Sequence, residues 1–403
     1  MSITIDNKKE LEPNPKKNHR STDHRMVDTG GEADNKSLES GGNHHHHHHL
    51  NNHQFFRQFL RITVLFVVVA APCLVLYHWT HPFELLPNYS SSSSSDHNYA
   101  LCDKDVSELK KVLKNASMAD KTVILTTLND AWAEPNSILD VFLESFRIGD
   151  QTSRLLNHLV IIALDQKAYA RCLASHPHCY ALKTQGNDFS GEAYFMTEDY
   201  LKMMWRRIRF LQSVLRLGYN FVFTDADIMW FRDPFPRFFP DADFQIACDN
   251  FWFKSDDLNN RPNGGFTYVK SNNQTIQFYN YWYSSKENYP GMHDQDVLNK
   301  IKFDPFIKTI GLKIRFLDTA HFGGLCEPSK DFNAVCTMHA NCCYGLESKV
   351  HDLRLMLEDW RKFMALSTDV RASQPSSWSV PKNCSLSNFH PPDSPKKNGG
   401  GRM

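Results

Sequence analysis

A short apolar strand that ends in two aspartates constrains this chain more than any other feature. Residues Phe221 to Thr224 form an apolar run, and Asp225 and Asp227 follow it one residue apart. Because side chains alternate along a strand, residues i and i+2 share a face, so both carboxylates are expected to point at one place. Paired carboxylates suit a hard divalent cation, and open α/β sheets bind nucleotides at such strand ends. The segment therefore predicts a metal site for a nucleotide diphosphate, with a solvated turn as the alternative.

Apolar runs alternate with helical patterns through the middle of the chain. Strands are expected at 122–127, 159–164, 221–224, 244–248, 265–269 and 313–317, and helices at 106–113, 137–147, 200–217, 276–284 and 350–364. Such alternation predicts an α/β fold with a mixed, mostly parallel sheet flanked by helices. Residues 102–367 are long enough to form one domain with a substantial core.

The N-terminal part of the 403-residue chain differs sharply from this domain. Residues 1–58 are polar and are predicted to be a disordered cytosolic tail. They include six consecutive histidines, which could bind metal or be a low-complexity or introduced tract. Within 59–79, the stretch Ile62 to Trp79 has no charged residue and nears the ~20 residues of a spanning helix. Lys and Arg precede it, and none follows until Lys104, which places the N-terminus in the cytosol. We expect a signal-anchor there, followed by a stem at 80–101, with a buried core helix as the alternative.

The residues after the expected anchor suit an oxidising compartment. Asn-X-Ser/Thr glycosylation sequons follow it at Asn88, Asn115, Asn273 and Asn383. Nine of the ten cysteines also follow it, so several should pair. Cys172–Cys179 and Cys326–Cys336 are plausible local bridges, but the spacing leaves the connectivity open. Residues 368–403 are expected to be a disordered tail, although Cys384 could be tied down. Equal numbers of basic and acidic residues (45 each) give no support for nucleic-acid binding.

Further motifs follow the aspartate pair in a fixed order. They are Pro262-Asn263-Gly264-Gly265-Phe266, Asp294-Gln295-Asp296-Val297-Leu298-Asn299, and Met338-His339-Ala340-Asn341-Cys342-Cys343. With Leu217 to Asp227, they resemble the nucleotide-sugar glycosyltransferases, and most closely the plant nucleotide-diphospho-sugar transferases of glycosyltransferase family 77. The resemblance covers roughly residues 120–365. It implies a GT-A fold and a metal-dependent transfer that retains the anomeric configuration, in a family that contributes to cell-wall glycans. Together with the expected anchor, this predicts a single-pass type II Golgi membrane protein.

The resemblance also implies roles for individual residues. Asp225 and Asp227 would hold Mn²⁺ or Mg²⁺ against the donor diphosphate. His339 is the candidate third ligand, with His321 as its rival, and Lys349 could meet the diphosphate as a point charge. In related retaining enzymes, the positions that match Asp294 and Gln295 lie beside the reacting carbon of the donor sugar. We therefore expect Asp294 to bind sugar hydroxyls and Gln295 to lie near that carbon, although Asp294 could be merely a helix N-cap.

The remaining donor contacts are predicted from residue chemistry and position. Glycines Gly264 and Gly265 let the backbone approach a ligand, and Asn263 can bond sugar hydroxyls, unless the motif is an ordinary turn. On the helix before the metal strand, Arg206 and Arg207 are donor-phosphate candidates or part of a solvated face. At the end of the first strand, three residues could contact the base or ribose: Thr126, Thr127 and Asn129.

Two other functions compete with a glycosyltransferase. Phosphatases that form an aspartyl-phosphate also use Asp-X-Asp, but their motif continues to Thr or Val where Met229 stands here. A catalytically silent, membrane-anchored sugar-binding protein on the same fold is the second alternative. We expect a transferase that moves a sugar, a pentose or galactose, from a UDP-linked donor to a glycan or glycoprotein acceptor. Arabinose, xylose and galactose all remain open, because one or two pocket residues can switch them.

Overall fold

The fold was analysed in a computed structural model, which describes residues 57, 61, 103–183, 196–252, 254–373 and 376–385. The described residues from 103 onward belong to one compact unit, and Arg57 and Arg61, which are helical and exposed, belong to a second. The predicted tail, anchor and stem (1–58, 59–79 and 80–101) otherwise lie outside the described residues. Among the helices that are described, none is long and apolar enough to cross a membrane.

A seven-stranded mixed sheet forms the centre of the described domain, with the order β3-β2-β1-β4-β7-β6-β8. The pairs β1–β2, β2–β3, β1–β4 and β6–β8 are parallel, whereas β7 runs antiparallel to both β4 and β6. This confirms the expected α/β fold with a mostly parallel sheet. The strands are β1 (Thr122–Leu128), β2 (Leu159–Ala163), β3 (Cys179–Ala181), β4 (Asn220–Thr224), β6 (Phe244–Asn250), β7 (Arg261–Val269) and β8 (Ile314–Phe316).

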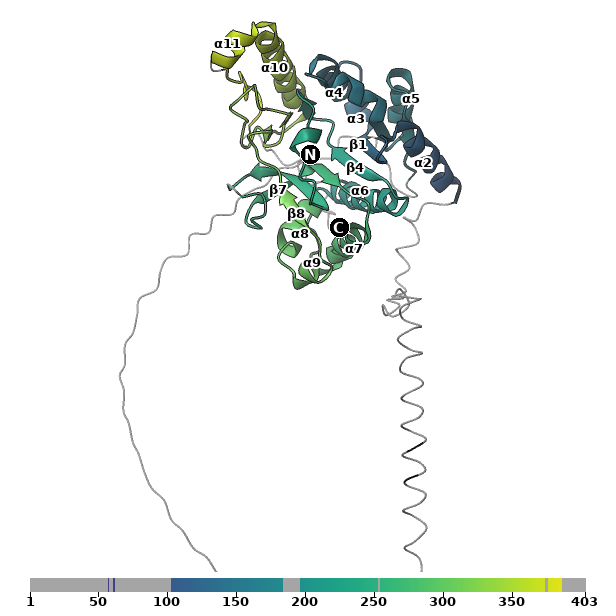
Figure 1. The fold of residues 1–403 in the computed structure, drawn as a ribbon. Coiled ribbons are helices and arrows are strands. Elements are labelled where there is room, and N and C mark those ends of the chain that lie inside the picture. Colours follow the sequence, from purple (N-terminus) through teal and green to yellow (C-terminus); the bar gives the residue numbers. More distant parts are fainter. Residues whose placement is uncertain are drawn as a thin grey trace, which may run out of the picture. The chain divides into compact units, whose positions relative to one another are not determined.

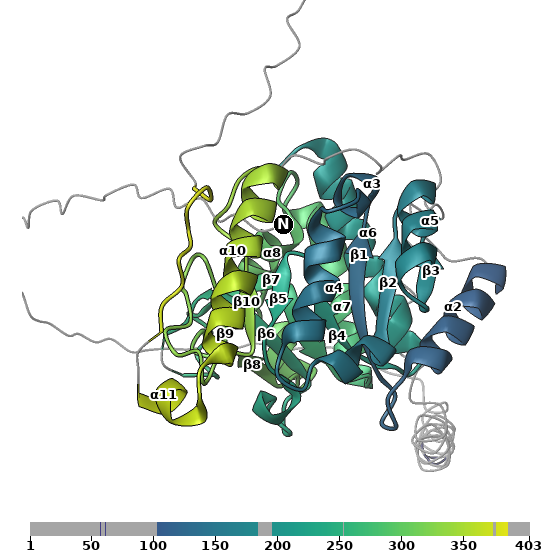
Figure 2. The same cartoon turned by 90° about the horizontal axis from the view of Figure 1, so that it is seen from above.

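Helices cover both faces of this sheet because the buried strands are apolar on both sides. One face packs on α4 (Ile138–Ile148) and α10 (Leu346–Ala365), which run alongside each other in Figure 2. The opposite face packs on α2 (Asp103–Ala116), α6 (Glu198–Arg216) and α7 (Asn273–Ser284). Figure 1 shows β1, β4 and β7 between α4 and α7. The remaining helices are α3 (Asp130–Ala133), α5 (Gln166–Ser175), α8 (Asp294–Ile301), α9 (Pro305–Thr309) and α11 (Thr368–Ser373), and the 3₁₀ helices are η2 (Ser153–His158), η3 (Phe235–Arg237) and η4 (Ser285–Asn288).

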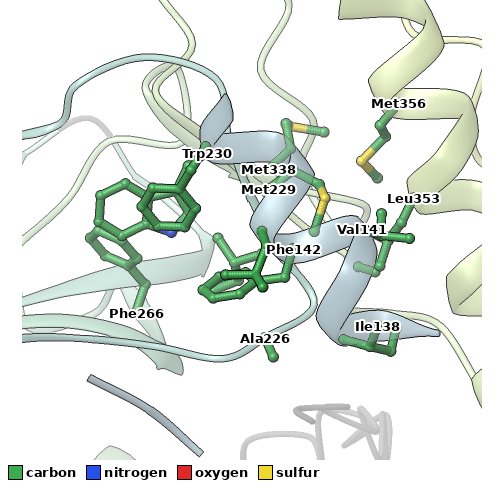
Figure 3. Close-up of a cluster of buried hydrophobic side chains, with 14 of the residues drawn as sticks. Ile138, Val141, Phe142, Ala226, Met229, Trp230, Phe266, Met338, Leu353 and Met356 are labelled. Carbon is green, nitrogen blue, oxygen red and sulfur yellow. The ribbon is translucent and has the colours of Figure 1, made fainter. Parts of the chain in front are cut away.

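A second sheet of three very short strands was not predicted from the sequence. It contains β5 (Ile228–Trp230), β10 (Thr337–His339) and β9 (Phe322–Gly324), in that order. β10 pairs antiparallel with β5, so that His339 lies opposite Ile228. Figure 3 shows Phe142 of α4 between Trp230 of β5 and the α10 side chains Leu353 and Met356. The small sheet is thus anchored in the same apolar core as α4 and α10.

Disulfides tie the C-terminal segments to this core. The predicted Cys172–Cys179 bridge is present, but Cys326 pairs with Cys342, so the predicted Cys326–Cys336 bridge is wrong. Cys336 directly precedes β10 and is buried as a free thiol. The segment after β10 lies beside Cys326 instead, because the backbone amide of Cys326 donates to Asn341 Oδ1. A third bridge joins Cys343 to Cys384.

Part of the expected C-terminal tail is packed rather than unordered. The ring of Trp378 stacks on Phe332 at a centroid distance of 4.0 Å, and Val380 is buried. The carboxylate of Asp352 accepts hydrogen bonds from three successive backbone amides, those of Lys382, Asn383 and Cys384. The domain therefore extends through residue 385 and does not end at 367.

Candidate active site

The strand β4 ends at Thr224, and the two aspartates that follow it lie in a turn. The amide of Ile228 donates to the carbonyl of Asp225 at 3.2 Å, which closes that turn before β5 begins. The amide of Asp225 donates to the carbonyl of Gly265 on β7 at 2.7 Å. Ala226, between the aspartates, is buried in the apolar core (Figure 3). The carboxylates are thus brought together by a turn, and our expectation of continued strand alternation was wrong in that detail.

The small second sheet brings His339 to this turn. Because β10 pairs with β5, the residue after His339, Ala340, donates its amide to the carbonyl of Asp227 at 3.0 Å. One ligand atom from each of Asp225, Asp227 and His339 lies within 4.8 Å of the others, and all three residues are buried. The rival His321 is not part of the group, because its Nδ1 lies 2.9 Å from the carbonyl of Ala334.

Two atoms of this group are arranged as a divalent cation would require. His339 Nε2 lies 3.2 Å from Asp227 Oδ1, and within the described residues both atoms are buried without a hydrogen-bond partner. Buried polar atoms are rarely left in this state, because their desolvation is costly unless a partner or ion compensates. Two carboxylates and an imidazole form a donor set that divalent metals accept. The residues present therefore fit a bound Mn²⁺ or Mg²⁺.

Lys349 also lies in this site, on the first turns of α10. Its Nζ lies 2.5 Å from Asp227 Oδ2 and 2.7 Å from the carbonyl of Ala340, and the side chain is fully buried. Burial alone would raise the pKa of Asp227, but the ammonium of Lys349 and then the imidazole of His339 outweigh it and hold that pKa well below its usual range. The structure thus describes Lys349 as the counter-ion of Asp227, and its contact with a diphosphate stays a prediction.

Arg207 links the aspartate turn to the second predicted motif. From α6, its guanidinium donates to Asp225 Oδ1 at 3.1 Å and to Asp294 Oδ2 at 2.7 Å, with all three residues buried. Burial would lower the pKa of Arg207, but Asp294 and Asp225 raise it above its ordinary value. In the same way, burial would raise the pKa of Asp294, and Arg207 outweighs it and lowers that pKa. The alternative candidate Arg206 turns elsewhere and donates to the carbonyl of Lys183.

The motif residues on β7 and α8 meet directly. The amide of Gly264 donates to Gln295 Oε1 at 2.9 Å, and Asn263 Oδ1 accepts from the amide of Gly265. Asp294 is the first residue of α8, whose N-cap is His293, so the alternative role of Asp294 as an N-cap is wrong. A Cβ added at Gly264 would lie 3.6 Å from Arg207, 3.8 Å from Asp294 and 3.9 Å from Gln295. The polar ends of these three side chains therefore gather on one side of Gly264.

The predicted nucleotide contacts lie at the topological switch point of the sheet, where β1 separates β2 from β4. Thr127, Asn129 and Asp225 line one pocket there, together with Trp132, Leu164, Met203, Met204 and Ala226. Asn129 also caps α3 by accepting from the amide of Trp132 at 3.2 Å. Thr126 does not line this pocket, because the side chain of a strand residue points away from those of its neighbours.

One important residue was missed. Asp249, near the end of β6, is buried, and its carboxylate accepts hydrogen bonds from three side-chain amides. Nothing in its spacing distinguishes it in the sequence. Of the predicted glycosylation sites, Asn115, Asn273 and Asn383 are exposed, and Asn88 lies outside the described residues.

Comparison with known proteins defines the class of enzyme. A profile of the family described as nucleotide-diphospho-sugar transferase matches residues 154–353. An uncharacterized protein of Arabidopsis thaliana is 52% identical over 302 residues, which cover 74% of this chain and 78% of that protein. The Arabidopsis UDP-D-xylose:L-fucose alpha-1,3-D-xylosyltransferase 3 is 25% identical over 211 residues, 51% of each chain.

The crystal structure of mouse xyloside xylosyltransferase 1 in its apo form aligns with 14% identity and a TM-score of 0.32, covering 55% of this chain and 98% of the mouse chain. The enzyme class rests on the sequence comparisons and on the site. The described fold and the matches together define a nucleotide-sugar-dependent transferase. The chain belongs to the nucleotide-diphospho-sugar transferase family.

Proposed function

We propose that this protein is a metal-dependent, retaining glycosyltransferase that acts on a UDP-linked donor. The observation that carries the proposal is the buried group of Asp225, Asp227 and His339, in which Asp227 Oδ1 and His339 Nε2 have no hydrogen-bond partner among the described residues. Mn²⁺ or Mg²⁺ held by the first three residues would supply positive charge against the diphosphate leaving group. Arg207, which bonds both Asp225 and Asp294, joins the metal ligands to the groups proposed to face the sugar.

The other residues of the site have separate tasks in this proposal. Lys349 keeps Asp227 ionised, and Arg207 does the same for Asp225 and Asp294, so that the site is charged before the donor arrives. Asp294 would bind the hydroxyls of the donor sugar. Gln295 would present its amide oxygen to the reacting carbon, where positive charge grows as the bond to the diphosphate breaks. The acceptor hydroxyl would form its bond to the sugar carbon on the face that the diphosphate vacates, and its proton would pass to an oxygen of the departing diphosphate.

The cellular setting is part of the same proposal. We place the protein in the Golgi membrane as a single-pass type II protein, with residues 59–79 as the anchor and the catalytic domain in the lumen. The disulfides and the exposed sequons suit an oxidising compartment. The acceptor would be a cell-wall glycan or a glycoprotein, and the likeness to a plant xylosyltransferase favours a pentose as the sugar.

The test is donor hydrolysis by the full-length protein in detergent, across a panel of nucleotide sugars and with Mn²⁺ present. We expect one UDP-sugar to be hydrolysed, with release of the sugar in its original anomeric configuration. The variants Asp225→Ala and Asp227→Ala should lose that activity and keep the circular dichroism spectrum. Full activity in the double variant would disprove the metal assignment, and tight donor binding without turnover on any acceptor would identify a silent sugar-binding protein instead.

A further inference from the structure

Asp249 is a buried carboxylate at the junction of three site segments. Its Oδ1 accepts from Asn263 Nδ2 at 2.7 Å and from Asn341 Nδ2 at 2.8 Å. Its Oδ2 accepts from Gln295 Nε2 at 3.0 Å. These partners come from β7, the segment after β10, and α8, and both Asn263 and Gln295 lie within the predicted donor site. One side chain therefore connects the three motifs that follow the aspartate pair.

This arrangement decides which way each amide faces. An ionised carboxylate can only accept hydrogen bonds, so every amide that bonds to Asp249 must turn its NH₂ group toward it. The amide oxygens then point away and accept from backbone amides. Asn263 Oδ1 accepts from the backbone amide of Gly265, and Asn341 Oδ1 accepts from that of Cys326. Gln295 Oε1 accepts from the backbone amide of Gly264.

For Gln295, the fixed orientation matters to the chemistry. Its Oε1 lies 3.9 Å from the position that a Cβ on Gly264 would take, on the same side of Gly264 as the polar ends of Arg207 and Asp294, where the proposed function places the donor sugar. Without Asp249, only the backbone amide of Gly264 would hold this orientation, and the NH₂ group could take that place more readily, because an amide has nearly the same shape in both orientations. The oxygen would stabilise positive charge there, whereas the NH₂ group would oppose it.

We propose that Asp249 is a positioning residue that holds the amide oxygen, and not the nitrogen, of Gln295 toward the reacting carbon of the donor sugar. The inference rests on the proposed glycosyltransferase function. Asp249 itself acts through Gln295 and does not need to touch the substrate. Its loss should therefore reduce kcat and leave the donor KM almost unchanged, since Arg207, Asp294 and the metal ligands keep their contacts.

The first variant is Asp249→Asn, which keeps the size of the side chain and removes its exclusive preference for NH₂ donors. We expect kcat for donor hydrolysis to fall about 10- to 100-fold, the range found when a group that orients an active-site ligand is lost. Asp352→Asn is the matched control, because Asp352 is an equally buried carboxylate that accepts three N–H groups, from Lys382, Asn383 and Cys384. The control should lower thermal stability and keep kcat.

A double-mutant cycle separates orientation from general damage to the fold. Gln295→Glu alone places the new carboxylate of residue 295 against the carboxylate of Asp249. When Asp249→Asn is added, the NH₂ group of residue 249 can donate to residue 295, so the pair is bonded again and an oxygen still faces the sugar. We expect the double variant to be more active than either single variant, which is a coupling that structural damage would not produce. The double variant also keeps a bonded pair if Asp249→Asn alone folds poorly.

Each outcome has a distinct meaning. A wild-type kcat in Asp249→Asn would overturn the role of Asp249. So would a double variant whose loss of kcat equals the product of the losses in the two single variants. Either result would leave the glycosyltransferase proposal standing. A large rise in donor KM with unchanged kcat would also overturn it. If the wild-type protein hydrolyses no nucleotide sugar, the proposed function fails, and the role of Asp249 fails with it.

Discussion

Two adjacent glycines on β7 allow the packing of the site to be tested by adding a single methyl group. A Cβ at Gly265 would lie 2.7 Å from both Asp225 Oδ2 and His339 Cε1, and 2.9 Å from Asn263 Oδ1. All three side chains are buried, and those of Asp225 and Asn263 are also hydrogen-bonded, so none can move aside freely. At Gly264, by contrast, the closest atom is Arg207 Nη2 at 3.6 Å, which is an ordinary contact.

The expected size of the effect follows from these distances. Overpacking a buried site costs about 1–3 kcal/mol. Replacing glycine by alanine also stabilises by about 0.4–1 kcal/mol, because the unfolded chain loses conformational freedom. The second effect is common to both variants, so Gly265→Ala should be less stable than Gly264→Ala by about 1–3 kcal/mol. Neither variant faces a positive-φ penalty, since neither residue is among the glycines with positive φ.

The assay is urea unfolding of both variants, followed by titration with Mn²⁺ and by donor kinetics. Gly265→Ala should lose about 10- to 100-fold in Mn²⁺ affinity because two proposed ligands are displaced. Gly264→Ala should keep its Mn²⁺ affinity and raise the donor KM, because its methyl group enters the space proposed for the sugar. Equal stability and equal Mn²⁺ affinity in the two variants would refute this reasoning.

Three further changes test the surroundings of the site. Lys349→Met should cost about 3–5 kcal/mol in the free energy of unfolding, because Asp227 is left buried and unpaired; a loss below about 1 kcal/mol in urea unfolding would contradict the ion pair. Replacing Cys326 and Cys342 by serine should cost about 3 kcal/mol and weaken Mn²⁺ binding, whereas the same change at Cys172 and Cys179 should cost stability alone, as calorimetry would show. For Asp352, burial raises the pKa, but the backbone amide of Asn383 and its other partners outweigh burial and lower it. Its stabilising effect should therefore be present above the unfolded pKa of about 3.9 and be lost as the pH falls through the lower pKa of the folded state, so urea midpoints of wild type and Asp352→Asn should approach each other between about pH 5 and pH 2.

The main sheet was predictable because its signals are local. The apolar run before Asp225 and the helical period of residues 200–217 each reflect burial within one element. The predicted helix 200–217 differs from α6 by one or two residues at either end. The order of the motifs also indicated which segments would meet at the site.

Other features depend on contacts that no local pattern records. The strands of the second sheet have three residues each, too few for any periodicity, yet their pairing places His339 beside Asp227. The pairing of Cys326 with Cys342 depends on the same sheet. Asp249 gave no signal because its three amide partners are scattered along the sequence, 14 residues away at Asn263, 46 at Gln295 and 92 at Asn341.

The ion pair of Lys349 with Asp227 has a consequence for biosynthesis. The two residues are separated by 122 positions, so the ribosome makes the carboxylate long before its counter-ion. A nascent chain without α10 would hold Arg207 beside Asp225, but it would have to enclose Asp227 in an apolar core without the ammonium group that pairs with it. We therefore expect β4 and β7 to close around Asp227 only after translation has passed residue 349.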